Sequence, residues 1–122
     1  MDCENPSALR NFYATLLGWE DKKDFSPEWS GVGAPGATPP FLLFQKVSGY
    51  KPPERPDEPE TQRQMTHIDF AVNDKEKAIQ HAISCGATIA SEQFSDNWTV
   101  MLDPAGHPFC LVQREFVFAE NE

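Results

Sequence analysis

The sequence has few basic residues and no long apolar run. Among its 122 residues, 10 are Lys or Arg and 19 are Asp or Glu, which gives a formal net charge of −9. Nucleic acids and anionic membrane surfaces are bound by basic faces, so this balance argues against both partners. The longest apolar runs, such as Phe41 to Phe44, are too short for a membrane-spanning helix.

Cysteine is also sparse. Cys3, Cys85 and Cys110 lie far apart, and no pair of them has the spacing of a zinc site. The first six residues have neither the basic region nor the apolar core of a secretory signal. We therefore expect reduced thiols and a cytoplasmic location.

The residues that are present suffice for one domain, which we predict over residues 1–122. Apolar residues make up 39% of the chain and aromatic residues 11%, enough for a packed core without disulfides. Seven of the eleven prolines fall between Pro35 and Pro59. The charged, proline-rich stretch at about 51–63 predicts an exposed linker between a first module of about 1–50 and a second of about 64–118.

Each module begins with the pattern of an amphipathic helix. In the first, Asn5 is a typical N-cap, Pro6 suits the first helical position, and Gly18 marks the end. In the second, Asp74 and Gly86 have the same roles. The apolar residues between these limits recur on one helical face: Ala8, Leu9, Phe12, Tyr13, Leu16 and Leu17, then Ala78, Ile79, Ala82 and Ile83.

Strands are predicted on either side of the helices. The predicted ranges are Trp19–Phe25, Ser30–Gly33 and Phe41–Val47 in the first module, and Thr66–Val72, Thr88–Ser91, Trp98–Leu102 and Phe109–Phe116 in the second. Asp103 to Gly106 has the composition of a type I turn, which makes the last two strands a hairpin. Pro40–Lys46 matches Pro108–Arg114 at an offset of 68. The order predicts an α+β fold of two βαβββ repeats, whose first copy has only Met1 to Cys3 for its opening strand.

Three segments together resemble the vicinal oxygen chelate superfamily, and within it the glyoxalase-like group that includes glyoxalase I, the bleomycin resistance proteins and dioxygenases. The segments are Asn5-Pro6 to Trp19-Glu20, Thr66-His67-Ile68-Asp69-Phe70 to Asp74, and Asp103-Pro104-Ala105-Gly106-His107-Pro108 to Val112. The resemblance covers nearly the whole chain. It implies two βαβββ modules whose mostly antiparallel strands form a curled sheet around a shared concave pocket.

The resemblance also implies where a divalent metal would bind in metal-dependent relatives. Those proteins take a His from the opening strand of each module and a Glu from each closing strand. Here the second His matches His67, the first would fall before Met1, and the Glu positions match Leu42 and Cys110. Since Leu42 cannot ligate, we predict no metal and no other cofactor. The disfavoured alternative is a divalent metal held by a different set of ligands.

Five residues are the candidates for function. His67 and Asp69, two apart on a strand, share one face and could form an acid–base pair. Phe41, Trp98 and Cys110 could contact a ligand, the aromatic rings by stacking. For Cys110, which lies between Phe109 and Leu111, an inert buried thiol is the commoner outcome. A reactive thiolate would need a nearby base, which His67 could supply only if the strands bring the two residues together.

Three functions are compatible with this sequence. The first is a metal-free binder that holds a small molecule, preferably cationic, in the inter-module pocket. The second is an enzyme, a lyase or isomerase or a dioxygenase of the same superfamily, that uses His67 with or without a metal. The third is a non-catalytic interaction domain whose shortened first strand exposes a sheet edge. A homodimer is expected in either a binding or an interaction role.

Overall fold

A computed structural model describes residues 1–37, 40–54, 59 and 62–118 of the chain. It divides the chain into two compact units, unit 1 (Met1–Pro52) and unit 2 (Pro53–Glu122). The predicted linker at 51–63 falls at this boundary, and part of it lies outside the described residues. No helix in the described part of the chain combines the length and the hydropathy needed to cross a membrane.

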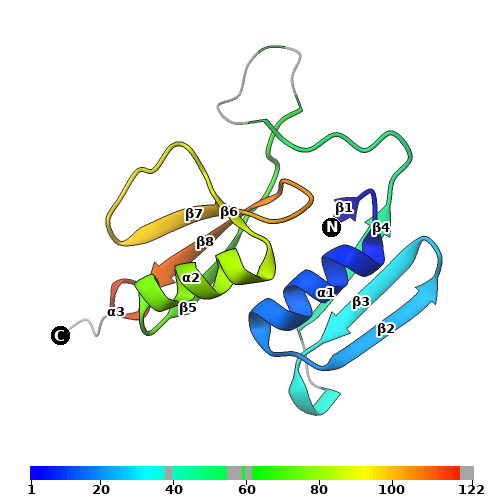
Figure 1. Ribbon diagram of the computed structural model, residues 1–122, viewed down its shortest axis with the longest axis horizontal. Helices are drawn as coiled ribbons and strands as arrows, with labels where there is room; N and C mark the ends of the chain where they lie inside the picture. Colours follow the sequence, from blue (N-terminus) through cyan, green and yellow to red (C-terminus); the bar gives the residue numbers. More distant parts are fainter. Residues whose placement is uncertain (38–39, 55–58, 60–61, 119–122) are drawn as a thin grey trace. The chain divides into compact units, whose positions relative to one another are not determined.

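The described residues of unit 1 form one α-helix, one short 3-10 helix and one four-stranded sheet (Figure 1). Along the chain come β1 (Asp2–Cys3), α1 (Pro6–Leu17), β2 (Asp21–Ser26), β3 (Trp29–Gly33), the short 3-10 helix η1 (Pro35–Ala37) and β4 (Phe41–Lys46). The spatial order is β1-β4-β3-β2. The β1 and β4 strands are parallel, whereas the other two pairs are antiparallel.

Unit 2 repeats this topology. Its elements are β5 (Ile68–Val72), α2 (Lys75–Cys85), β6 (Thr88–Ile89), β7 (Trp98–Leu102), β8 (Pro108–Gln113) and α3 (Arg114–Val117). The order is β5-β8-β7-β6, again with one parallel pair, β5 with β8. The prediction of an α+β fold with two βαβββ modules and a very short first strand is confirmed.

The end of the last predicted strand is wrong. The sequence predicted strand through Phe116, but β8 ends at Gln113 and the next four residues form α3. Arg114 and Glu115 are polar and the three residues after them are apolar, with no Gly or Pro at the strand end, so no local signal in the sequence marked the change. Four other strands are also shorter than predicted. In unit 2, β5 begins at Ile68 rather than Thr66, and β6 ends at Ile89 rather than Ser91. In unit 1, β2 begins at Asp21 rather than Trp19, and β4 ends at Lys46 rather than Val47.

The predicted helix limits are confirmed. The Asn5 side chain accepts a hydrogen bond from the Ala8 backbone N–H, and Asp74 accepts one from Lys77. Gly18 and Gly86 end their helices with φ of 68° and 115°. This is the left-handed region where glycine has no Cβ penalty, so both helices stop where the sequence indicates.

The predicted turn at Asp103–Gly106 is confirmed as well. The Gly106 N–H donates to the Asp103 carbonyl at 2.9 Å. The buried Asp103 carboxylate also accepts hydrogen bonds from the N–H groups of Ala105 (2.9 Å) and His107 (3.0 Å). These two hydrogen bonds to the Asp103 side chain stabilise the turn, and the turn fixes the register between β7 and β8.

The offset of 68 between the two closing strands is wrong by one residue. Cys3 and Val72 are equivalent positions, because each lies two residues before the N-cap of the helix that follows. Cys3 pairs with Lys46, and Val72 pairs with Gln113. Lys46 and Gln113 are therefore equivalent, and the offset between the closing strands is 113 − 46 = 67. Cys110 is therefore equivalent to Leu43, and Leu42 is equivalent to Phe109. A shift of one residue moves a strand's side chains to the opposite face of the sheet.

Packing in unit 1 supports this corrected register. Phe44 is fully buried and stacks on Tyr13 of α1 at 5.6 Å between ring centroids, so its face of β4 is covered by the helix. Leu42 shares that face by strand alternation. Phe41 and Leu43 lie on the other face, over Gly31, where a Cβ would be 2.5 Å from Phe41 Cε1.

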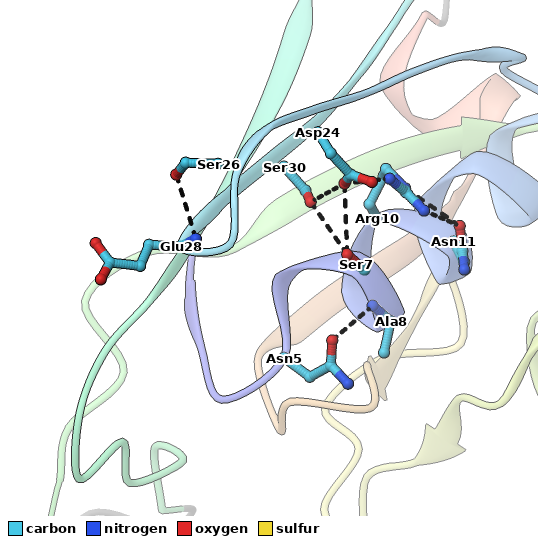
Figure 2. A network of polar contacts seen from close by, with 9 residues as sticks. All are labelled: Asn5, Ser7, Ala8, Arg10, Asn11, Asp24, Ser26, Glu28 and Ser30. Atoms are coloured by element: carbon cyan, nitrogen blue, oxygen red, sulfur yellow. Dashed lines mark hydrogen bonds and ion pairs between the residues drawn. The ribbon is translucent and has the colours of Figure 1, made fainter.

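A polar network ties α1 to the sheet of unit 1 (Figure 2). Asp24 on β2 accepts hydrogen bonds from Ser30 (2.5 Å) and Ser7 (3.4 Å), and it forms an ion pair with Arg10 of α1. These contacts, led by the Ser30 hydrogen bond and followed by Arg10, lower the pKa of Asp24 below its ordinary value of 3.8. The ionised Asp24 carboxylate thus links β2 to β3 and to α1.

The Asp24→Asn variant should be less stable than the wild type near neutral pH. Because the folded-state pKa is depressed, the ionised carboxylate stabilises the fold above pH 3.8, and this contribution is lost as the pH falls through the folded-state pKa. Chemical unfolding of both proteins across this acid range should show their stability difference shrinking. A difference that stays constant with pH would contradict this role for the charge.

Candidate functional site

The candidate site is a pocket in unit 2, on the sheet face opposite α2. Its volume is about 470 Å³. Most of the wall is aromatic or aliphatic, and the polar groups are few. The lining residues are Gln64, His67, Asp69, Phe94, Trp98, Val100, Pro108, Cys110, Val112, Phe116 and Val117.

Strand alternation explains which side chains reach the pocket. On β8, Pro108, Cys110 and Val112 point into it, while Phe109 and Leu111 point to the face that α2 covers. Paired residues of β7 share the pocket face, with Trp98 opposite Val112 and Val100 opposite Cys110. Val100, Cys110 and Val112 pack with Ala90 into one buried apolar cluster.

His67 and Asp69 provide a polar wall. His67 Nδ1 lies 2.9 Å from Asp69 Oδ1, so the predicted same-face pair is present and hydrogen-bonded. Both side chains are about half exposed, 47% and 53%. With Nδ1 facing the carboxylate, Asp69 favours the tautomer that has its proton on Nδ1 and leaves Nε2 as the acceptor.

Cys110 belongs to the same cluster. Asp69 on β5 pairs directly with Cys110 on β8, and Cys110 is only 8% exposed. Donor atoms of His67, Asp69 and Cys110 all lie within 4.8 Å of one another. The sequence left open whether the strands would bring His67 and Cys110 together, and the structure does so.

Two glutamine side chains fix the walls of the pocket. Gln93 bonds both backbone groups of Val100, donating to its carbonyl and accepting from its N–H, each at 2.8 Å. This contact pins the segment between β6 and β7, from which Phe94 projects. Gln113 donates to the Asn73 carbonyl (2.8 Å) and to Glu115 (2.7 Å).

The Gln113 contacts set the position of α3 at the rim. The hydrogen bond from Gln113 is the main reason that the pKa of Glu115 lies below its ordinary value. One turn of α3 then places Phe116 beside Trp98, with ring centroids 5.8 Å apart and planes tilted by 43°. The two rings together form an aromatic part of the pocket wall.

Four of the five predicted site residues meet in this pocket: His67, Asp69, Trp98 and Cys110. Phe41 belongs to unit 1 and is not among the lining residues. Its ring lies 6.2 Å from that of Phe25 and covers the glycines of β3. Whether any of the five contacts a ligand remains a prediction.

Sequence reasoning missed the other lining residues. Val100, Pro108 and Val112 could have been found by counting in twos from Trp98 and Cys110, since alternate strand residues share a face. The same counting along the predicted strand reaches Phe116, whereas Val117 lies beyond its predicted end and lines the pocket from α3. Phe94 lies in a segment without regular structure, where no periodicity marks an inward side chain.

Comparison with known protein families shows which family this chain belongs to. Residues 1–112 match the family described as the glyoxalase-like domain. The chain belongs to this family. The resemblance to the vicinal oxygen chelate fold seen in the sequence is thereby confirmed.

Solved structures of glyoxalase-like proteins share the fold. A glyoxalase/bleomycin resistance protein/dioxygenase family enzyme from Burkholderia phytofirmans PsJN is 21% identical, with 93% of both chains covered and a TM-score of 0.65. The trypanothione-dependent glyoxalase I of Leishmania major is 19% identical over 96% of this chain and 84% of its own, with a TM-score of 0.64. A glyoxalase-related enzyme from Fulvimarina pelagi is 14% identical over 93% and 84%, with a TM-score of 0.59. The comparison with curated proteins gives no match.

The residues present do not fit the four-ligand metal site that the glyoxalase resemblance implies. In the corrected register the closing-strand positions are Leu43 and Cys110, and neither supplies a carboxylate. Among the described residues, the group able to hold an ion is His67, Asp69 and Cys110, with one nitrogen, one oxygen and one sulfur donor. That set differs from an all-oxygen-and-nitrogen site and suits a thiophilic ion instead.

Proposed function

We propose that this glyoxalase-like protein binds a small molecule in the pocket of unit 2 without a metal. The observation that supports the proposal is the combination of an apolar cavity of about 470 Å³ with a hydrogen-bonded His–Asp pair at its wall. Small-molecule sites in proteins have volumes of about 300–1,000 Å³ and combine apolar walls with a few polar groups that orient the ligand.

The lining residues define the chemistry of the ligand. Trp98 and Phe116 favour a flat or aromatic body. Asp69 favours a hydrogen-bond donor or a positive charge at the polar wall, and the net charge of −9 attracts cations from a distance. The pocket therefore suits an aromatic compound with a basic or hydrogen-bond-donating group.

Replacing Trp98 with Ala should weaken binding of such a compound by about ten- to a hundredfold, the scale of losing one aromatic wall. Ligand-observed NMR with a panel of aromatic amines measures this on the full chain. Trp29→Ala is the matched control, because Trp29 lies on β3 of unit 1 and is not a lining residue.

The control outcome decides between a pocket and a nonspecific apolar surface. Equal losses in both tryptophan variants would contradict the proposal, as would the absence of any binder in the panel.

Elemental analysis after dialysis tests whether the protein holds a metal. Less than one atom per chain, with binding unchanged by a chelator, is expected, whereas binding that a chelator abolishes would overturn the metal-free site.

An enzymatic role is the second candidate, supported by the 2.9 Å contact between His67 and Asp69. A positioned His–carboxylate pair can move a proton to or from a bound carbonyl compound, as a lyase or isomerase requires. Among the residues that the structure describes, no Lys or Arg lines the pocket to stabilise an oxyanion, which favours binding over turnover. If the wild-type protein shows turnover and the His67→Ala variant does not, catalysis rather than binding alone would be the favoured function.

The homodimer remains a prediction. It draws support from the short β1, which pairs only with Gln45 and Lys46 of β4 among the described residues. Uncovered strand edges favour pairing with another chain. Sedimentation analysis over a range of concentrations tests this expectation, and a monomer at all concentrations would contradict it.

A further inference from the structure

We propose that Cys110 is a nucleophile, served by His67 as its base and positioned with Asp69, that captures α,β-unsaturated carbonyl compounds entering the pocket. The inference rests on the proposed function only in requiring a pocket that admits small molecules. It goes beyond that function by assigning a covalent reaction and a class of reactant.

The geometry contains the three parts of an activated thiol. A thiol needs a base that accepts its proton, and that base needs a partner that orients it. Asp69 holds the His67 ring through the 2.9 Å contact at Nδ1. Cys110 Sγ lies within 4.8 Å of a donor atom on each of these two residues, so the thiol, the base and the orienting carboxylate form one cluster. The same three roles recur on unrelated folds.

Burial makes the reaction selective. Cys110 is 8% exposed and lines the cavity, so a reactant approaches it through the pocket. Val100 and Val112 flank it on the pocket face and make its surroundings apolar. An apolar electrophile is concentrated by these walls, whereas a strongly hydrated one is not.

The reaction balances without a co-reactant. The Sγ proton of Cys110 passes to His67 while sulfur forms a bond to the β-carbon of the unsaturated carbonyl compound. The electron pair of the carbon–carbon double bond moves to the α-carbon, which then takes the proton from His67. The adduct contains every atom of both partners, and nothing is oxidised or reduced.

The other two cysteines provide internal references. Cys3 is 1% exposed and pairs within the sheet of unit 1. Cys85 on α2 is half-buried, and its Sγ lies 3.8 Å from His81 Nε2. Cys85 thus has a nearby histidine and more exposure than Cys110, but it is not a lining residue of the pocket. If exposure or a neighbouring histidine were sufficient, Cys85 would react first.

The test measures alkylation by N-ethylmaleimide, an unsaturated carbonyl reagent, on the full chain after chelator treatment. Peptide mass spectrometry gives the rate at each cysteine. Cys110 is expected to react at least about tenfold faster than Cys85. His67→Gln should remove that advantage and leave the Cys85 rate unchanged. Asp69→Asn should lower the limiting alkylation rate at Cys110. The N-ethylmaleimide concentration that gives half of this limiting rate should not change, as expected of a positioning residue.

Two results would overturn the proposal: a Cys110 rate no higher than that of Cys85, or a Cys110 rate that His67→Gln does not change. The unchanged Cys85 rate shows that the variant is folded. The two proposals fail separately. Compounds that bind reversibly while Cys110 stays unreactive refute the covalent step alone, and fast labelling without any reversible binder refutes the proposed binding function alone.

Discussion

Replacing Phe109 with Ala is expected to lower the free energy of unfolding by about 3–5 kcal/mol. Phe109 is fully buried on the face of β8 that α2 covers, and its ring lies 6.0 Å from that of Phe70. Truncation removes the whole ring from a packed site and leaves a cavity that the neighbouring strands cannot fill. Urea unfolding followed by circular dichroism measures the loss.

The matched control is Phe94→Ala. Phe94 is also a phenylalanine of unit 2, but it is 65% exposed at the pocket wall. Its replacement should change stability by less than about 0.5 kcal/mol, as for other surface substitutions. Similar losses in the two variants would mean that the assignment of the two faces in unit 2 is wrong.

Leu42→Asp should destabilise the protein by about 3 kcal/mol. The corrected strand register places Leu42 on the face of β4 that packs against α1, beside the buried Val32 of β3. The substitution removes apolar contact and puts a carboxylate at a partly buried position, where it loses part of its hydration. The same unfolding assay detects the change.

Leu43→Asp is the neighbouring control, one residue along the same strand. Leu43 is 42% exposed, so a carboxylate there keeps much of its hydration and the loss should be under about 1 kcal/mol. The pair of variants tests the register directly. If Leu43→Asp were the more damaging of the two, the offset of 68 predicted from the sequence would be restored.

The helices could be predicted because their signals are local. Asn5 and Asp74 cap the helices through their own side chains, and Gly18 and Gly86 end them through a backbone conformation that few other residues adopt. Neither feature depends on the rest of the fold. The turn at Asp103 is local in the same way, since its carboxylate bonds the next residues of the chain.

The alignment of the two closing strands could not be predicted to one residue. Leu42 and Leu43 are chemically alike, and Pro-Phe at 40–41 matches Pro-Phe at 108–109 by sequence alone. Backbone pairing with β1 and β5 decides which of them faces the helix. A pattern with apolar residues on both faces carries no register information, so the tertiary contacts supply it.

The sequence by itself determined the α+β repeat, the ends of both helices and the shared face of His67 and Asp69, because each depends on residues close together in the chain. The tertiary structure alone decided that Cys110 joins that pair and that Phe94 and Phe116 complete the wall. Those contacts need the pairing of β5 with β8, the Gln93 bonds to β7 and the turn of α3 after Gln113. Residues distant in the chain become neighbours only through such packing, which local patterns do not encode.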